Sequence, residues 1–403
     1  MRLTVERLGH LGDGIAPGPV FVPMVLPGEV VEGDVVDGRM TAPRIVTPSP
    51  DRVKPACPHY RACGGCGLMH ASDDFVAGWK ADVVRTALAA QGLDAPFRPV
   101  VTSPPQSRRR ATLSGRRTKK GALVGFHGRA SGTIVEIPGC RLLHPHLMAA
   151  LPTLAEVTAL GASRKGEVGL TVTVTEGGLD LTVAEGKPLD QSLFSALAAL
   201  AERADLARIV WNGEPVASRR PAAQRFGAAR VVPPSGAFLQ ATAAGEAALV
   251  GAVREAVGAA KRIADLFAGA GTFSLPLAER AEVHAVEGEA AMLAALDAGW
   301  RQTTGLHRVT TEARDLFRRP LLPDELTRFD AVVIDPPRAG AEAQARELAG
   351  SGVQVIAAVS CNPVTFARDA RILSDAGFAI DWVQVVDQFR WSPHVELAAR
   401  LSR

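Results

Sequence analysis

The chain of 403 residues is poor in aromatic side chains and in cysteine. Aromatic residues make up 5% of it, with a single tyrosine, so any stacking on nucleic acid bases would depend on few positions. Five cysteines are too few and too unevenly spaced for a disulfide scaffold. No apolar run has membrane-spanning length, and the first thirty residues carry charges in place of an apolar signal segment. We therefore expect a cytoplasmic protein with no membrane association and no obligate protein partner.

Positive charge is unevenly distributed along the chain, although the net charge is only +3. Between Arg98 and Arg141 there are ten lysines and arginines against one acid, Glu136. A second group without acids follows, namely Arg219, Arg220, Arg225 and Arg230. A local excess of positive charge favours contacts with phosphates, as in a nucleic acid, although a solvated face has the same pattern.

The pattern of the chain predicts three domains. Residues 1–50 read as short strands broken by glycine and proline turns, which is typical of a small β-barrel. Residues 51–235 begin with a proline-rich link and continue as a mainly β central domain. Within them, a helix over 72–95 is expected to pack on the following domain, and a second helix is expected over 189–202.

Residues 236–403 predict an α/β domain with a doubly wound parallel sheet. Four short apolar runs, each followed by a stretch compatible with a helix, alternate along it: 263–267, 283–286, 331–334 and 353–359. The last two runs, 380–386 and 395–401, predict a terminal antiparallel pair of strands.

Candidate site residues follow the apolar runs of this domain. Gly269 and Gly271 come after the first, Glu287 after the second, Asp335 after the third and Cys361 after the fourth. Open α/β sheets bind ligands beyond the carboxyl ends of their strands. The glycines permit a tight turn that a ligand can approach closely, and the acid after the next strand suits ribose hydroxyls. The third glycine of a dinucleotide fingerprint is missing, so a nicotinamide site is disfavoured, while another nucleotide or a plain tight turn stays open.

Cys361 has the features expected of a reactive thiol. It lies in Ser360-Cys361-Asn362-Pro363, where Asn362 can cap a helix and Pro363 suits its first position. The positive end of that helix is expected to lower the pKa of the thiol, which favours a nucleophile over a buried core cysteine. Glu396 is the candidate base, although an exposed strand carboxylate would have the same pattern.

The other four cysteines form a candidate metal site. Cys57, Cys63 and Cys66 are spaced as Cys-x5-Cys-x2-Cys, and Cys140 lies on a later Pro-Gly turn. Four thiolates suit a [4Fe–4S] cluster or a zinc ion equally well, and four unligated cysteines are the third possibility.

Several motifs carry a resemblance to a known family. The stretch from Asp265 to Thr272 looks like the first motif of S-adenosylmethionine-dependent methyltransferases. Nearly the whole chain resembles the RNA 5-methyluridine methyltransferases, which have a Ser-Cys-Asn-Pro nucleophile motif, a His-x-Glu base, an Asp-Pro-Pro-Arg loop and a glutamine before the sheet. The matching positions are Cys361, Glu396, Asp335 to Arg338 and Gln240.

The resemblance implies S-adenosylmethionine as cofactor and a covalent reaction at carbon 5 of uridine. Cys361 would be the nucleophile and Glu396 the base, with Asp335 at the edge of the uracil and Asp315 beside the adenine. Thr272 stands where many relatives carry asparagine, which weakens any cofactor contact there. The residues implied to contact the cofactor or the uracil are Gln240, Phe267, Gly269, Gly271, Thr272, Glu287, Asp315 and Asp335.

The resemblance also implies an RNA partner and a cluster. The cysteine spacing occurs in an iron–sulfur branch of the family, which favours a [4Fe–4S] cluster, and residues 1–50 resemble a TRAM domain, a small RNA-binding β-barrel. Both features are typical of the branch that acts on 23S ribosomal RNA, so we expect that substrate. The alternatives are a transfer RNA uridine-5 methyltransferase, an amino methyltransferase, an iron–sulfur oxidoreductase with a dinucleotide, and an RNA-binding module without activity.

Overall fold

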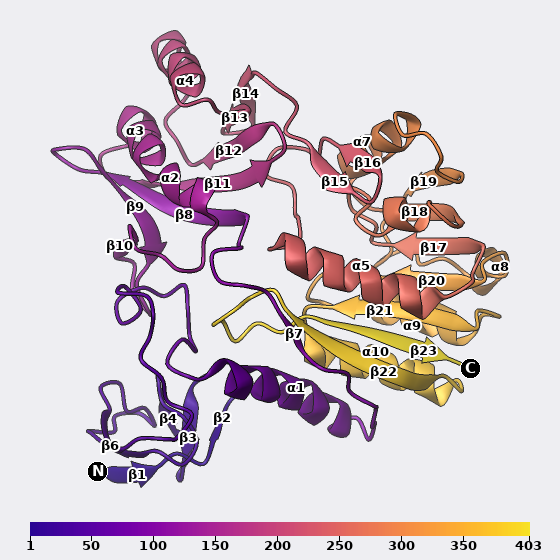
Figure 1. Cartoon of the computed structure of the whole chain (residues 1–403), viewed down its shortest axis with the longest axis horizontal. Coiled ribbons are helices and arrows are strands. Elements are labelled where there is room, and N and C mark those ends of the chain that lie inside the picture. The colour runs from indigo at the N-terminus through magenta and orange to yellow at the C-terminus, as the bar shows by residue number, and fades with distance from the viewer.

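The computed structural model describes residues 1–403. Figure 1 shows a small all-β region at the N-terminus, a central sheet covered by short helices, and a larger α/β body that contains the C-terminus. The predicted α/β class with a doubly wound sheet is confirmed. None of the helices combines the length and the apolar character needed to cross a membrane.

The α/β body is built on an eight-stranded sheet of order β19-β18-β17-β20-β21-β23-β22-β7. Neighbouring strands from β19 to β21 run parallel, and β23 lies antiparallel between β21 and β22, as predicted for the terminal pair. The strands are β17 (Arg262–Leu266), β18 (Glu282–Glu287), β19 (Val309–Ala313), β20 (Ala331–Ile334), β21 (Val355–Ser360), β22 (Ala379–Asp387), β23 (Leu397–Ser402) and β7 (Val101–Thr102).

Helices cover both faces of this sheet, which explains why a central strand such as β20 is buried along its whole length. One apolar cluster contains Leu249, Leu275 and Leu296 from three helices, and a second contains Leu348 and Leu373 on the other face. The helices are α5 (Ala243–Val257), α6 (Ser274–Leu277), α7 (Ala290–Arg301), α8 (Pro323–Leu326), α9 (Glu342–Ala349) and α10 (Pro363–Asp375).

Helix α1 (Asp73–Ala89) packs on the α/β body although it precedes the central domain in the sequence. Ser72 caps it by accepting a hydrogen bond from the amide of Phe75 at 3.3 Å. Val84 and Leu88 belong to the same apolar cluster as helices α9 and α10. Strand β7 then adds to the edge of the large sheet, parallel to β22. The segment from α1 to β7 is therefore built into the α/β body.

The central sheet has seven strands in the order β10-β9-β8-β11-β12-β13-β14. Helix α4 (Gln191–Arg203) confirms the helix predicted over 189–202, whereas α2 (Pro145–Ala149) and α3 (Leu151–Gly161) were not predicted, because their prolines lie in first turns and look like breakers in the sequence. The strands are β8 (Arg110–Arg117), β9 (Ala122–His127), β10 (Ile134–Glu136), β11 (Glu167–Thr175), β12 (Gly178–Ala184), β13 (Arg208–Trp211) and β14 (Glu214–Ser218).

A short hairpin connects the central sheet to the α/β body. It consists of β15 (Gln224–Phe226) and β16 (Ala229–Val231), and its Phe226 and Val231 are buried in the apolar cluster of α5 and α7. The hairpin and α1 both precede residue 235 in the sequence, yet both pack on the α/β body. The predicted domain limits at 50 and 235 therefore stay predictions.

The N-terminal region forms the short strands that its turns predicted. Two three-stranded sheets, of order β1-β5-β6 and β2-β3-β4, enclose a small apolar core. Glu29 is wholly buried there, where it accepts hydrogen bonds from the amides of Leu26 and Ser49 and pairs with Arg52. The strands are β1 (Arg2–Thr4), β2 (Arg7–Leu8), β3 (Gly14–Ala16), β4 (Val20–Val22), β5 (Val30–Glu32) and β6 (Arg44–Thr47).

Candidate active site

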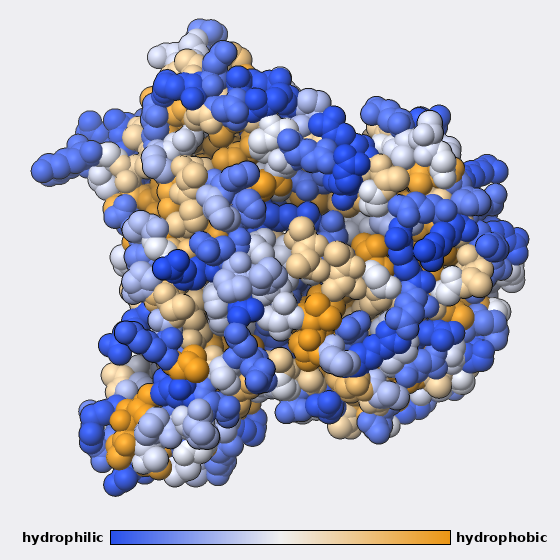
Figure 2. All heavy atoms as spheres, in the orientation of Figure 1, coloured by the Kyte–Doolittle hydropathy of each residue, from blue (hydrophilic) through white to orange (hydrophobic).

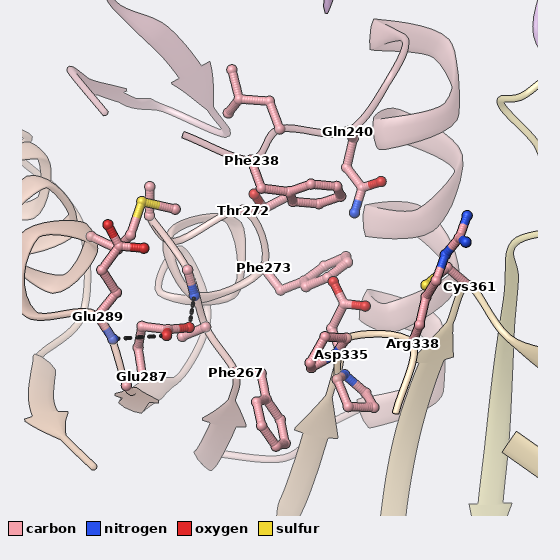
Figure 3. A pocket seen from close by; sticks show the side chains of 18 of the residues that line it. Phe238, Gln240, Phe267, Thr272, Phe273, Glu287, Glu289, Asp335, Arg338 and Cys361 are labelled. Carbon is pink, nitrogen blue, oxygen red and sulfur yellow. Dashed lines mark hydrogen bonds between the residues drawn. The ribbon is translucent and has the colours of Figure 1, made fainter. Parts of the chain in front are cut away.

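A cavity of about 880 Å³ opens at the carboxyl ends of the parallel strands. Its size is typical of a site for a cofactor or another small molecule. Figure 3 shows Glu287 and Glu289 at one side of the cavity, and Asp335, Arg338 and Cys361 at the other. The residues predicted from the sequence that line it are Gln240, Phe267, Gly269, Thr272, Glu287, Asp315, Asp335, Cys361 and Glu396.

Glu287 holds the glycine turn in place. One of its carboxylate oxygens accepts a hydrogen bond from the amide of Gly269, and the other accepts one from the amide of Glu289, each at 3.0 Å (Figure 3). The turn needs a left-handed backbone, with φ of 63° at Phe267 and 55° at Gly269. Glu287 thus fixes the loop after β17 against the loop after β18, and the cavity lies beside both.

Gly271 is the one predicted cofactor residue that does not line the cavity. A Cβ atom at this position would lie 2.8 Å from Cγ of Leu296 and 3.0 Å from Cδ1 of Leu275. The glycine is needed because the turn packs closely on α7. Its place in the motif therefore reflects packing, and a direct contact with a cofactor is not expected.

The far end of the cavity is aromatic. The rings of Phe267 and Phe317 lie 5.4 Å apart, and Asp315 accepts a hydrogen bond from the amide of Phe317 at 3.0 Å. Phe317 is 48% exposed, so its ring is free to pack on a ligand. Phe317, Glu289 and the neighbouring Met292 were not predicted, because no motif of the sequence distinguishes them.

Cys361 lies between the end of β21 and the cap of α10, as the sequence predicts. Asn362 caps the helix by accepting a hydrogen bond from the amide of Val364 at 3.1 Å, and proline occupies the first turn. The predicted lowering of the thiol pKa is wrong. Burial, together with the nearby carboxyl groups of Glu396 and Asp335, raises the pKa of Cys361 to about 11. These effects outweigh the helix end and the positive Arg338.

Glu396 is a buried carboxyl group, so its interpretation as an exposed strand residue is wrong. It is 2% exposed, and burial raises its pKa to about 7. Asp335 keeps part of its surface open to the cavity, yet burial and the charges of Glu396 and Asp265 raise its pKa well above the ordinary value. Three acidic groups, Cys361 included, therefore share one poorly solvated region.

Gln388, which was not predicted, links two of the predicted residues. Its amide nitrogen donates to the side-chain oxygen of Gln240 at 2.5 Å and to the carboxylate of Glu396 at 2.6 Å. Its amide oxygen accepts a hydrogen bond from the amide of Ala241 at 2.7 Å. Gln388 is 1% exposed and belongs to no motif, so only the fold reveals it.

A positive side chain lies beside the reactive end. Arg338 donates a hydrogen bond to Nδ1 of His394 at 3.1 Å, and burial lowers the pKa of this histidine, which suits an acceptor. The ring centroids of Phe389 and His394 lie 5.7 Å apart, and Cζ of Arg108 lies 5.8 Å from the centroid of the Phe389 ring. All four side chains line the cavity.

The basic stretch does not form the single surface that its sequence predicts. Arg108 and Arg110 line the cavity, and Arg109 is mostly buried and pairs with Glu246 at 2.5 Å. Arg116 of the same stretch pairs with Glu167. The second basic group is also largely neutralised, because Arg219 and Arg220 pair with Asp205, and Arg225 and Arg230 pair with Glu176.

Unpaired positive charge remains at the tip of the β8–β9 hairpin. Arg117, Lys119 and Lys120 are exposed there, and none of them pairs with an acid. Because Glu167 of β11 lies opposite Arg116, the preceding residues Arg164 and Lys165 continue alongside the same tip. Figure 2 shows the hairpin as a hydrophilic projection of the molecule. We call these five cations the hairpin tip.

Cys57, Cys63, Cys66 and Cys140 line one small cavity in the central region. Burial, together with the other thiols of the group, raises the pKa of Cys66 to about 12. No three or more cysteine, histidine or acidic side chains lie where they could together hold a metal ion. The predicted [4Fe–4S] cluster therefore has no direct support from the arrangement of donors.

Comparison with known proteins agrees with this site. The sequence model of the family described as tRNA (Uracil-5-)-methyltransferase matches residues 189–403. An uncharacterized RNA methyltransferase of Brucella suis is 45% identical, over 100% of this chain and 98% of the relative. The 23S rRNA (uracil(1939)-C(5))-methyltransferase RlmD of Halomonas elongata is 34% identical, over 98% of this chain and 88% of the relative.

A solved structure shares the fold over the whole chain. The tRNA (uracil-54, C5)-methyltransferase of Pyrococcus abyssi, in complex with S-adenosyl-L-homocysteine, matches with a TM-score of 0.77 and 23% identity, covering 100% of this chain and 99% of that chain. The chain thus has the Rossmann-like α/β fold of that structure. The chain belongs to the tRNA (uracil-5-)-methyltransferase family, as its motifs predicted, and is an S-adenosylmethionine-dependent RNA methyltransferase.

The environment of Cys361 predicts a thiol of low reactivity in the free protein. We expect its alkylation by iodoacetamide, followed by peptide-resolved mass spectrometry, to accelerate up to about pH 11. Glu396→Gln removes one of the negative charges that raise the pKa of Cys361, so the midpoint of the alkylation rate against pH should move to lower pH. Glu287→Gln, at the other side of the cavity, should leave it in place. A midpoint below the ordinary value in the unaltered protein would show that the helix end dominates.

Proposed function

We propose that the protein methylates carbon 5 of a uridine in 23S ribosomal RNA. The observation that carries the proposal is the single cavity that Cys361, Asp335 and Glu396 share with the glycine turn. The 34% identity over almost the whole chain to a 23S rRNA uracil-C5 methyltransferase favours ribosomal RNA. The description of the matching family favours transfer RNA instead, so that substrate is the second candidate.

S-adenosylmethionine supplies the methyl group when bound, and the residues around the glycine turn fit it. Glu287 and Glu289 offer carboxylate oxygens for ribose hydroxyls, and Asp315 lies beside the exposed ring of Phe317, where an adenine would be stacked. Thr272 and Gln240 line the cavity between this end and Cys361. The target uridine would reach the site only after it is extruded from the folded RNA.

The reaction we propose begins with the thiolate of Cys361. Its sulfur adds to carbon 6 of the uracil, and the electron pair of the carbon 5–carbon 6 double bond moves to form an enolate at the carbon 4 oxygen. Asp335, whose raised pKa favours its protonated form, can donate a hydrogen bond to that oxygen. Carbon 5 becomes nucleophilic and takes the methyl group, while the bond from that methyl to the sulfonium sulfur would break and leave its electron pair on the sulfur.

Glu396 completes the reaction as a base. Its pKa of about 7 leaves a useful fraction of carboxylate at neutral pH, and it takes the proton from carbon 5. The electron pair of that carbon–hydrogen bond restores the double bond and expels Cys361 as a thiolate. Because the thiol of the free protein has a raised pKa, its deprotonation must accompany RNA binding.

Variants at Cys361 and Glu396 test the function and its mechanism. RNA from cells with and without the protein is mapped for 5-methyluridine, and the site that disappears identifies the substrate. In purified reactions, Cys361→Ala should bind cofactor but form no covalent RNA adduct. Glu396→Gln should form a methylated adduct that persists, seen as a slow band in denaturing gels, with turnover reduced by about 10²–10⁴-fold.

Two results would contradict the mechanism. Full methylation by Cys361→Ala would show that no thiol adduct is needed. An adduct that survives in the Cys361→Ala, Glu396→Gln double variant would show that another residue is the nucleophile. A lost 5-methyluridine in transfer RNA, with ribosomal RNA unchanged, would select the second substrate.

We further propose that Cys57, Cys63, Cys66 and Cys140 bind a [4Fe–4S] cluster. The four thiols line one cavity without converging on a point, and a cluster separates its thiolates more widely than a single zinc ion does. Backbone amides donate to the sulfurs of Cys63 and Cys140 at 3.4 Å, which suits thiolate ligands. The bound cluster would join the loop at 57–66 to the central sheet.

Metal content tests this proposal. Protein purified without oxygen should be brown and contain about four irons per chain. Cys140→Ser should lose most of the iron, whereas Cys361→Ser should keep it, because Cys361 lies in the other cavity. Stoichiometric zinc without iron, or equal iron loss in both variants, would contradict the assignment.

We also propose that the hairpin tip binds the RNA backbone. Replacing Arg117, Lys119 and Lys120 by alanine should weaken RNA binding and reduce the slope of log affinity against log salt by about two to three. Arg219→Ala with Arg220→Ala is the control, because both guanidiniums already pair with Asp205. An unchanged slope in the hairpin variant would show that these cations are merely solvated.

A further inference from the structure

Lys80 of α1 is buried against the loop that carries the proposed base. Its side chain is 0% exposed, and its ammonium donates to Oδ1 of Asp387 at 2.6 Å, to the carbonyl oxygen of His394 at 2.8 Å and to that of Phe389 at 3.2 Å. All three of its donors are therefore used. The acceptors lie more than three hundred residues away in the sequence.

The three acceptors span the whole connection between β22 and β23. Asp387 is the last residue of β22, Phe389 follows it, and His394 lies just before β23. We call residues 387–396 the catalytic loop. It contains Gln388 and Glu396, which are joined by a hydrogen bond of 2.6 Å. A single ammonium thus holds both ends of the segment that presents the carboxylate to the cavity.

We propose that Lys80 is a positioning residue for the methylation reaction, which fixes the catalytic loop so that Gln388 holds Glu396 toward the reacting carbon. The inference rests on the proposed role of Glu396 as the base. Lys80 does not line the cavity, so it acts only through the loop.

Stability alone does not account for this arrangement. Removing a lysine and an aspartate from water is costly, and an apolar pair of similar volume is often as stable. The second carboxylate oxygen of Asp387 has no hydrogen-bond partner, so the ion pair is not optimised for binding energy. What an apolar pair lacks is donors for the two loop carbonyls. The exact path of the loop therefore depends on the ammonium.

A second ion pair between the same two elements provides a matched control. Arg390 of the catalytic loop pairs with Asp73, in the first turn of α1, at 2.5 Å. The side chain of Asp73 is 57% exposed, so this pair contributes little. Asp73→Asn removes an ion pair between α1 and the loop without disturbing the buried one.

The experiment measures formation and breakdown of the covalent RNA adduct separately in single-turnover reactions. In Lys80→Met, combined with Asp387→Asn to avoid an unpaired buried charge, breakdown should slow by about 10–100-fold, because the base is displaced. Adduct should accumulate on ordinary RNA, while affinity for S-adenosylmethionine changes less than about twofold. Asp73→Asn should behave as the unaltered protein.

Gln388→Met is the second variant and keeps the inference testable if the first does not fold. It leaves the Lys80 contacts intact but removes both donors from the glutamine, so adduct breakdown should slow in the same way. The hydrogen bond from Gln388 lowers the pKa of Glu396, so its loss should also move the acid limb of the breakdown rate to higher pH. The other ionisable groups facing this region stay in place, namely Asp335, Cys361, Arg338, Arg108 and His394.

The outcomes separate this inference from the proposed function. RNA carrying 5-fluorouridine traps the adduct in the unaltered protein if the covalent mechanism holds, and a failure to trap overturns the mechanism and the inference together. If trapping succeeds but the Lys80 and Gln388 variants break down adduct at the ordinary rate, the inference alone is wrong. An equal loss of cofactor binding, adduct formation and breakdown would assign Lys80 to folding only.

Discussion

Exclusion of water from the reactive end of the cavity controls the chemistry of this protein. Cys361, Asp335 and Glu396 are close enough that each negative charge disfavours the next, and burial leaves little solvent to separate them. The protonated form of the thiol is therefore favoured in the free protein at neutral pH. In the proposed mechanism, such a site keeps the thiol unreactive until a substrate changes the balance of charge and hydrogen bonds.

Three distant parts of the chain build this environment. Helix α1 contributes Lys80, the segment before α5 contributes Gln240, and the connection between β22 and β23 contributes Gln388 and Glu396. The amide of Gln388 joins the connection to the segment before α5, and the ammonium of Lys80 joins α1 to the same connection. Each buried polar group needs its partner, so a shift in any one part leaves donors or acceptors unpaired.

The sequence predicted the position of Cys361 better than its electrostatics. The position was predictable because a strand end, an asparagine cap and a proline are local features. The pKa of Cys361 was predicted in the wrong direction, because burial and two carboxyl groups raise it, namely Glu396 just before β23 and Asp335 just after β20. Likewise, the arginines from 108 to 110 read as a free surface, whereas Glu246 of α5 neutralises Arg109. Partners far away in the chain leave no trace in a local pattern.

The sequence by itself determined the α/β class, the family and nine of the residues that line the cavity, because strand runs, turns and motifs are short-range features. Tertiary structure alone decided that Gly271 packs on α7, that Gln388 donates a hydrogen bond to Glu396, and that Lys80 binds the loop before it. The physical reason is that burial and hydrogen-bond partnership depend on which segments meet, and a pattern along one segment cannot specify the residues of another.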